Sequence, residues 1–302
     1  MIENKVIIFN KDLPKEIIDN SVISLGSFYT MHKGHQKILN ETLRIAKEQN
    51  LVPICMILNE YDFMPSREFY SVDWRIKYLQ EKGFENIIVF DKTLSNFSID
   101  GIDFVNYLIN SFSAKILVAG KDFKFGKNRN YDLTKVENLI KTKKINLEKI
   151  NNVKISSNIL YETLKNNEFK IARDILGRNY SFSGRVIHGE KIARKLGFPT
   201  ANVEVGNNIN ILNDGVYLTY TKVKNKLYPS ITSVGRKETF HKNWEKTYES
   251  HILNFNKDIY DIDVEVFLIK KIRDQKKFNY VDELISQIRK DKDYAISYFI
   301  NE

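Results

Sequence analysis

Residues 21–40 read SVISLGSFYTMHKGHQKILN, and this stretch decides the fold of the first half of the chain. The apolar run at 22–25 predicts a buried strand, and apolar residues at helical spacing over 34–49 predict a helix after it. The turn between a strand and a helix is a place where backbone N–H groups and the helix dipole bind phosphate. The stretch therefore predicts an α/β domain with a phosphate site at this turn.

Two histidines in this turn suggest what is done to the phosphate. His32 and His35 are three residues apart, and Gly26 and Gly34 let a nucleotide approach the backbone closely. Imidazole N–H groups can stabilise negative charge on a phosphate under attack. The alternative interpretation is that both histidines are surface residues of an ordinary turn.

The same alternation of apolar runs and helical segments continues to about residue 150, which predicts a parallel sheet with crossover helices. Ser71 and Gly83 mark the start and the end of one of these helices. The other predicted strands lie at 51–58, 86–90 and 115–119, and a further helix lies at 100–112.

Beyond two short helical segments at 159–166 and 168–176, the apolar period changes to two. Antiparallel hairpins that close into a small β-barrel are therefore expected, followed by a helix at 281–289 packed on the barrel. The change of period predicts two domains, residues 1–176 and residues 177–302. The period-two segments are 180–186, 216–223 and 248–255.

Composition excludes several classes of protein. The 302 residues are 42% hydrophobic and carry a formal net charge of +9, with basic residues spread among acidic ones, so no nucleic-acid partner is expected. No apolar stretch is long enough to cross a bilayer and the N-terminus has no signal-peptide pattern, so a cytoplasmic location is expected. The lone Cys55 lies in an apolar run and is expected to be a buried small hydrophobe.

The second half contains the most specific motif, GFPTAN at residues 197–202. In an extended segment, the side chains of Thr200 and Asn202 project to one side. A hydroxyl and an amide in that arrangement can hold Mg²⁺ and phosphate oxygens together. The alternative is a proline turn followed by an edge strand whose polar side chains are satisfied.

The N-terminal motifs resemble the HxGH nucleotidyltransferase superfamily. The turn at 26–35 and the segment VAGKDFKFG at 118–126 are most similar to the N-terminal module of bacterial bifunctional riboflavin kinase/FAD synthetases. That resemblance implies an FMN adenylyltransferase domain with His32 and His35 in catalysis. It also implies nucleotide binding by Gly26, Phe28, Gly34, Gly120, Asp122, Phe125, Ser156 and Ser157.

The C-terminal half resembles the riboflavin kinase domain of the same family. GFPTAN matches the family's motif without a change, and E-x-H-x-x-x-F recurs at 249–255. The resemblance implies ATP-dependent phosphorylation of riboflavin to FMN, with Mg²⁺ held at Thr200 and Asn202 and with Glu249 as the catalytic base. His251, on the same strand face, is expected to give structural support, with proton transfer as the alternative. The resemblance also implies substrate binding by Gly189, Lys191, Gly197, Pro199, Thr200, Asn202 and Arg273.

The N-terminal half departs from the family at positions that bear on FAD synthesis. Tyr29-Thr30 replaces Asp-Gly, Asn158 replaces a Thr, and Tyr161 stands where the family has an Arg. Tyrosine cannot replace the bidentate phosphate contact of a guanidinium. Three readings follow: an enzyme that makes both FMN and FAD, a riboflavin kinase with a weak or regulatory N-terminal module, and a non-catalytic flavin-sensing protein.

Overall fold

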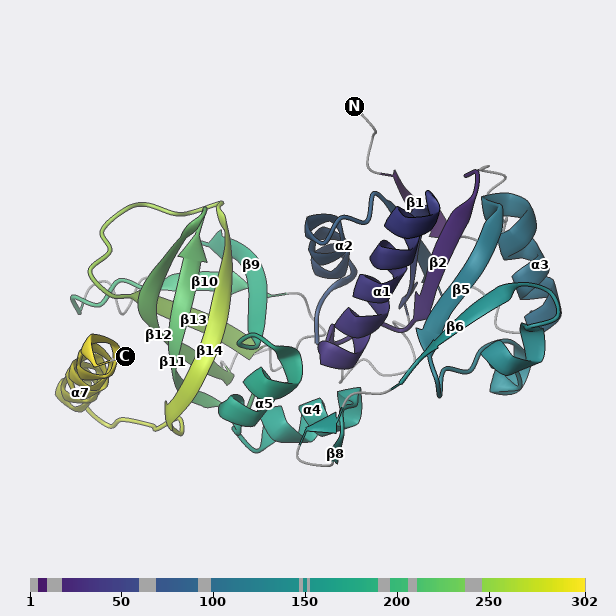
Figure 1. Ribbon diagram of the computed structural model, residues 1–302. Coiled ribbons are helices and arrows are strands. Elements are labelled where there is room, and N and C mark those ends of the chain that lie inside the picture. The colour runs from purple at the N-terminus through teal and green to yellow at the C-terminus, as the bar shows by residue number, and fades with distance from the viewer. Residues whose placement is uncertain are drawn as a thin grey trace. The chain divides into compact units, whose positions relative to one another are not determined.

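The computed structural model describes residues 5–9, 18–59, 69–91, 99–146, 149–150, 153–189, 196–205, 211–236 and 246–301 (Figure 1). The chain forms two compact units, Met1–Ile159 and Leu160–Glu302. They are described separately. Among the described residues, no helix is long and apolar enough to span a membrane.

The first unit contains a six-stranded, fully parallel sheet in the order β1-β4-β3-β2-β5-β6. Its four predicted strands are confirmed. β1 and β6 at the two edges were not predicted, because β1 lies before the first motif and β6 reads KTKKI, with lysines at alternate positions of an exposed edge. The strands are β1 (Lys5–Phe9), β2 (Ser21–Gly26), β3 (Val52–Asn59), β4 (Asn86–Asp91), β5 (Ala114–Gly120) and β6 (Lys141–Ile145).

Helices cover both faces of this sheet (Figure 1). The predicted N-cap of α2 is confirmed, because the Ser71 side chain accepts a hydrogen bond from the backbone N–H of Trp74. Asp100 caps α3 in the same way by accepting from Ile102 N–H at 2.8 Å. The helices are α1 (Lys33–Gln49), α2 (Val72–Glu81) and α3 (Gly101–Phe112).

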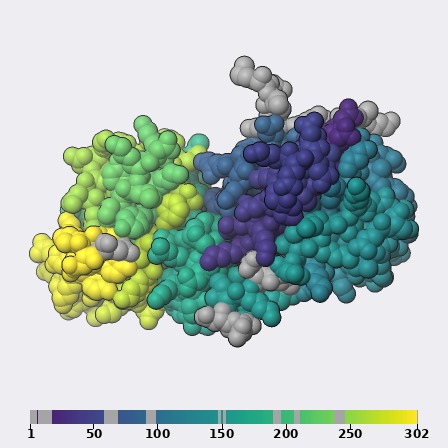
Figure 2. All heavy atoms as spheres, in the orientation of Figure 1, coloured from purple at the N-terminus to yellow at the C-terminus, as the bar shows by residue number. Residues whose placement is uncertain are grey.

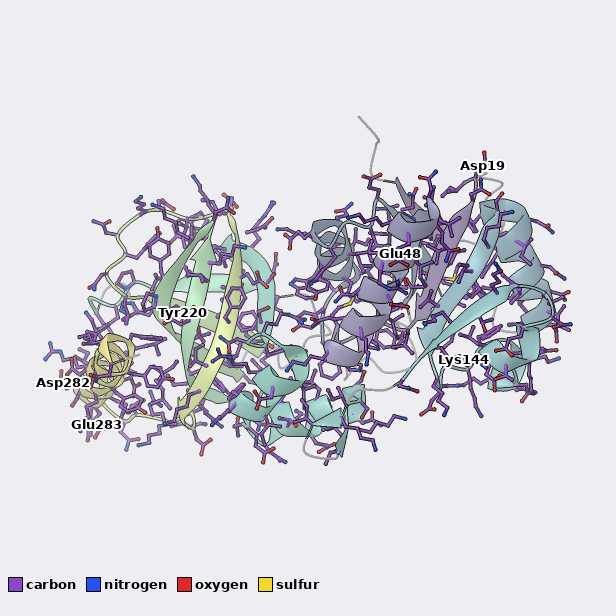
Figure 3. All side chains as sticks on the ribbon, viewed as in Figure 1. Asp19, Glu48, Lys144, Tyr220, Asp282 and Glu283 are labelled. Carbon is purple, nitrogen blue, oxygen red and sulfur yellow. The ribbon has the colours of Figure 1, made fainter. Side chains whose placement is uncertain are left out.

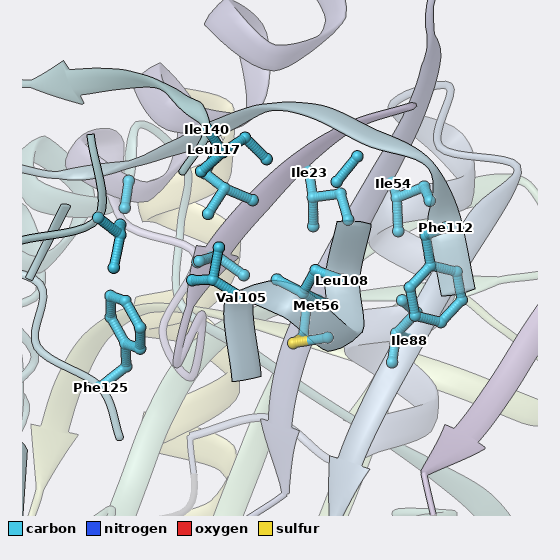
Figure 4. Packing of buried hydrophobic residues seen from close by; sticks show 14 of the residues in the cluster. Ile23, Ile54, Met56, Ile88, Val105, Leu108, Phe112, Leu117, Phe125 and Ile140 are labelled. Atoms are coloured by element: carbon cyan, nitrogen blue, oxygen red, sulfur yellow. The ribbon is translucent and has the colours of Figure 1, made fainter. Parts of the chain in front are cut away.

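The sheet has an apolar core on each side because successive strand residues point to opposite faces. Ile23 and Met56 pack with Leu108 of α3 on one side (Figure 4). Val22 and Cys55 pack with the helices of the opposite face. Cys55 is fully buried, as predicted, and its burial raises the pKa of its thiol to about 12.

Short elements complete this unit and lead into the second. They are the 3₁₀ turns η3 (Lys127–Arg129) and η4 (Leu133–Val136), the hairpin strands β7 (Lys149–Ile150) and β8 (Val153–Lys154), and helices α4 (Ser157–Lys165) and α5 (Phe169–Leu176). In the second unit, the ring of Phe169 on α5 contacts Tyr217 edge-on at 5.8 Å. The predicted boundary at residue 176 remains a prediction, since it concerns which fragment folds alone.

The second unit is a closed antiparallel barrel in the order β10-β13-β12-β11-β14-β9, as predicted. Glycine is required at position 184 on β9, because a Cβ there would lie 2.1 Å from the carbonyl oxygen of Glu204 on β10. The strands are β9 (Ser181–Ile187), β10 (Ala201–Glu204), β11 (Gly215–Val223), β12 (Lys226–Arg236), β13 (Lys246–Ile252) and β14 (Asp263–Arg273).

Five hydroxyl side chains inside the barrel form a closed hydrogen-bonded ring. Each oxygen contacts two others at 2.8–3.3 Å, and all five residues have no exposed surface. The Ser230 hydroxyl also contacts the backbone carbonyl of Thr219 at 3.1 Å, so every one of these buried hydroxyls has hydrogen-bond partners. The ring runs through Thr219, Ser230, Thr221, Ser250 and Thr232.

The C-terminal helix is longer than predicted. α7 spans Val281–Ile300, with Asp282 and Glu283 in its first turn (Figure 3), whereas the sequence predicted an end at residue 289. Asp291, in the charged run at 290–293, is buried in an ion pair with Arg273, and the helix continues past it. In the space-filling view α7 forms the yellow surface of this unit (Figure 2).

Candidate active sites

The phosphate-binding turn lies at the switch point of the parallel sheet. From β2, the chain first adds β3 and β4 on one side and later adds β5 and β6 on the other. Ligands of such sheets bind beyond the carboxyl ends of the strands at this point. Leu25 pairs with Ala119, so Gly26 and Gly120 come together at the carboxyl edge, as the two motifs require.

His32 both caps helix α1 and faces its partner histidine. Its Nδ1 accepts a hydrogen bond from the backbone N–H of His35 at 3.1 Å, so in the neutral ring the proton is on Nε2. The two imidazoles are stacked with centroids 3.8 Å apart. The predicted pair is therefore brought together.

Three motif residues in this turn serve its packing. A Cβ at Gly26 would lie 2.9 Å from the ring of Phe28, and one at Gly34 would lie 3.1 Å from the ring of His32. Phe28 is fully buried and its ring meets His35 edge-on at 5.2 Å. The two glycines thus let these aromatic side chains fold back onto the turn, while nucleotide contact by all three residues remains a prediction.

A buried arginine that sequence reasoning missed lies beneath the turn. Arg75 of α2 is 1% exposed and donates to the backbone carbonyl of Ser27 at 3.3 Å, and its guanidinium lies 5.1 Å from the ring centre of Tyr29. The pKa of His35 lies well below its usual value. Burial is the largest cause, and the nearby charges of His32 and Arg75 add to it. The available signal was an arginine four residues before Leu79 on the buried face of one helix.

The segment Ile155-Ser156-Ser157, which leads into helix α4, also contacts this turn. The Ser157 and Thr30 hydroxyls are 3.3 Å apart, and Ser156 accepts from the backbone N–H of Ile159 at the start of α4. Tyr161 follows Ser157 by four residues on the same helix, so the two share a helix face. The family's arginine would therefore project from the turn of α4 that follows the serines.

The segment VAGKDFKFG at 118–126 contains both buried and exposed residues. Phe125 is buried in the core beside α3, whereas Asp122 is exposed and pairs with Lys154 of β8. That hydrogen bond to Lys154 lowers the pKa of the Asp122 carboxyl. Phe125 thus fixes the segment, and Asp122 lies on its exposed side.

Four of the predicted kinase residues, Thr200, Asn202, Glu249 and Arg273, line one cavity of about 320 Å³ in the barrel unit. His251 lines the same cavity. Apolar side chains form most of the remaining wall, which suits a flat aromatic ligand with a polar end. The apolar lining comes from Leu196, Phe198, Val216, Ile231, Phe278, Leu284 and Ile288.

Strand pairing places the carboxylate of Glu249, the predicted base, opposite the amide of Asn202. Asn202 of β10 is the cross-strand partner of Glu249 on β13, and directly opposed side chains lie about 4.5–5.5 Å apart at Cβ. A Cβ at Gly189 would lie 2.3 Å from the Asn202 amide nitrogen, so glycine makes room for this side chain. The hydroxyl and amide oxygens beside the carboxylate fit Mg²⁺, which takes few protein oxygens and keeps substrate phosphates as ligands.

A second cavity, of about 440 Å³, adjoins the first through Thr200, which lines both. Pro199 and Ser250 belong to its wall, together with the segment 255–260. Gly197, with φ at +89°, turns the chain just before this point. The predicted Lys191 lies outside the described residues, as do residues 237–240.

Arg273 does more than line the cavity. Its Nε and Nη2 donate to the Asp291 carboxylate of α7 at 2.7–3.1 Å, and Gln287 donates to the same carboxylate at 2.9 Å. The pair therefore anchors α7 against the barrel. Nearby, Gln275 donates to the hydroxyl of Ser233 at 2.8 Å and to the carbonyl of Val234 at 3.2 Å. Substrate binding by Arg273 remains a prediction.

Comparison with known proteins gives the same assignment for each half. A model described as FAD synthetase matches residues 15–164, and one described as riboflavin kinase matches residues 176–299. A relative from Buchnera aphidicola subsp. Schizaphis graminum named "Bifunctional riboflavin kinase/FMN adenylyltransferase" is 34% identical over 94% of this chain and 96% of its own length. One of the same name from Bacillus subtilis is 31% identical over 96% of each chain.

The fold also matches a solved structure described as "Macrolide-efflux Protein from Streptococcus pneumoniae". The TM-score is 0.83 at 29% identity, over 96% of this chain and 98% of that one. The family expected from the motifs is confirmed by the full-length relatives. The chain belongs to the bifunctional riboflavin kinase/FMN adenylyltransferase family.

Proposed function

We propose that this protein phosphorylates riboflavin to FMN in its barrel and adenylylates FMN to FAD at its HxGH turn. The observation that carries the first reaction is the placement of Glu249 opposite Asn202 in the cavity that also contains Thr200. The carboxylate can accept a proton, and the two neutral oxygen ligands beside it can bind phosphate through a metal ion.

In the kinase reaction, we assign riboflavin to the 320 Å³ cavity and ATP to the 440 Å³ cavity. Their shared residue, Thr200, then lies where the γ-phosphate meets the ribityl chain. Glu249 accepts the proton of the terminal ribityl hydroxyl as its oxygen attacks the γ-phosphorus, and ADP leaves. Thr200 and Asn202 would hold Mg²⁺, and a bound metal ion would neutralise phosphate charge there.

In the adenylyl transfer, an FMN phosphate oxygen attacks the α-phosphorus of ATP and pyrophosphate leaves. His32 can donate its Nε2–H to the developing charge, since its Nδ1 is occupied by the His35 backbone. The lowered pKa of His35 makes it a neutral donor rather than a fixed cation at pH 7. The missing arginine at position 161 makes this the slower reaction.

The decisive experiment is to incubate the purified protein with riboflavin, ATP and Mg²⁺ and to separate FMN from FAD by chromatography. We expect FMN to accumulate before FAD. FMN without any FAD would favour a regulatory N-terminal module. Absence of both products, with riboflavin still bound, would favour the flavin sensor, which needs no carboxylate such as Glu249. Mg²⁺ as the metal and a cytoplasmic location are parts of this proposal.

A further inference from the structure

His251 makes a contact that the kinase reaction as described does not use. Its Nδ1 lies 2.8 Å from the carbonyl oxygen of Pro199. A carbonyl can only accept, so Nδ1 carries the hydrogen and, in the neutral ring, Nε2 does not. Burial, which dominates, and Lys292 hold the pKa of His251 below its usual value, although the bond to Pro199 opposes this shift. The ring is therefore a neutral Nδ1–H donor at pH 7.

This contact lies where the β10–β13 ladder ends. The last backbone pair in that direction is Ala201 with Ser250, and β10 begins at Ala201. Pro199 and Thr200 precede the strand and lie outside the ladder. The imidazole thus holds the chain one peptide before Thr200, at the point where backbone pairing stops.

The contact also connects two parts of the reaction centre. His251 is two residues from Glu249, and the intervening Ser250 is fully buried, so the carboxylate and the imidazole share the cavity face of β13. Pro199 belongs to the segment that carries Thr200. The His251 side chain therefore connects β13, which carries the proposed base Glu249, to the segment that carries Thr200.

We propose that His251 is a positioning residue, whose Nδ1–H clamps the Pro199 carbonyl and so fixes Thr200 beside Asn202 and Glu249. It does not exchange a proton with substrate. This inference rests on the proposed kinase reaction, and it assigns His251 a role in placing Thr200 for Mg·ATP rather than in proton transfer.

Two amide variants test which of the two ring nitrogens of His251 makes the functional contact. In His251→Asn the side-chain N–H₂ can take the place of Nδ1 and still donate to Pro199, whereas in His251→Gln the amide extends toward the place of Nε2. We expect His251→Asn to bind Mg·ADP within about twofold of the wild type. We expect His251→Gln and His251→Phe to bind it roughly three- to tenfold more weakly, the range for losing one hydrogen bond. Because His251 also lines the cavity assigned to riboflavin, riboflavin affinity is measured for each variant, and we expect it to fall less than Mg·ADP affinity in His251→Gln.

Calorimetry with Mg·ADP and fluorescence titration with riboflavin measure these affinities without turnover, and the KM for Mg·ATP and kcat are compared afterwards. Equal loss of Mg·ADP affinity in the Asn and Gln variants would overturn the proposal, as would a fall in kcat of a hundredfold or more in His251→Asn with unchanged KM. The imidazole ¹⁵N spectrum, assigned with His251→Asn, gives a further test, because an Nε2–H tautomer at pH 7 contradicts the clamp. If the wild type fails to phosphorylate riboflavin, the proposed function is wrong. The imidazole tautomer and the Mg·ADP affinities still show whether His251 holds Pro199.

Discussion

The barrel and the HxGH turn use their motif residues differently. In the barrel, Thr200, Asn202 and Glu249 line one cavity. In the parallel α/β unit, Phe28 fills the space above Gly26 and the ring of His32 packs on Gly34. A family motif thus combines residues that line a cavity with residues that shape a turn, and variants can separate the two groups.

The largest effect is expected for Glu249→Gln, which keeps the size of the side chain but removes the proton acceptor. Riboflavin phosphorylation should fall by about 10²–10⁴, the usual contribution of a general base. FAD synthesis from added FMN should not change. Glu204→Gln, at an exposed position on β10, is the matched control. Near-normal turnover of Glu249→Gln, measured by FMN production, would contradict the assignment of the base.

The next largest effect is expected for His32→Asn. Asparagine is a good N-cap, so it can still accept from the His35 backbone and hold helix α1, but it lacks the imidazole donor. FAD synthesis from FMN should fall by about 10²–10³, as for the loss of one charge-stabilising donor. Thermal unfolding checks that α1 is retained, and the exposed Lys33→Ala serves as control. FAD output within threefold of the wild type would remove His32 from the reaction.

The sequence predicted the fold because its local signals were consistent. Ser71 and Gly83 mark the ends of a helix by capping and by a positive φ, and these signals depend on neighbours in sequence alone. Alternation likewise indicated a barrel. It could not show that Thr219 or Ser230 lies inside the barrel, since a hydroxyl in a strand pattern looks like a solvent-facing residue until its partners are known.

The candidate sites show the same limit. GFPTAN located Thr200 and Asn202, but the pairing of Asn202 with Glu249 depends on strands far apart in sequence. Arg75 was missed because an arginine on a helix normally reads as exposed. The C-terminal helix was predicted too short because Asp291 owes its burial to Arg273, 18 residues earlier.

A smaller effect, of opposite sign, is expected when the family's arginine is restored in the first half. Tyr161→Arg should raise FAD output by roughly ten- to a hundredfold, because a charge-assisted bidentate contact is worth about 1.5–3 kcal/mol. Riboflavin phosphorylation should be unchanged. Tyr161→Lys is the control, since it adds the charge without the planar fork and should give a smaller gain. No gain in FAD from either variant would show that position 161 does not limit the reaction.

The smallest effect tests whether restoring a family residue also helps in the barrel unit. Residues 273–278 read RDQKKF and resemble the family's R-D-E-x-x-F, with Gln275 in place of the glutamate. The Gln275 amide donates to the Val234 carbonyl and to the Ser233 hydroxyl, and an ionised carboxylate cannot donate to the carbonyl. Gln275→Glu should therefore lower the free energy of unfolding by about 0.5–1.5 kcal/mol.

Because the folded state favours the protonated carboxyl, the pKa of the new side chain should be higher in the folded than in the unfolded protein. The variant should then recover stability as the pH falls through that folded pKa and lose it as the pH rises. Thermal unfolding at pH 5 and pH 8 measures this, with Gln275→Met as the control that has no titrating group. A Gln275→Glu protein as stable as the wild type at pH 8 would mean that the two hydrogen bonds contribute nothing to stability.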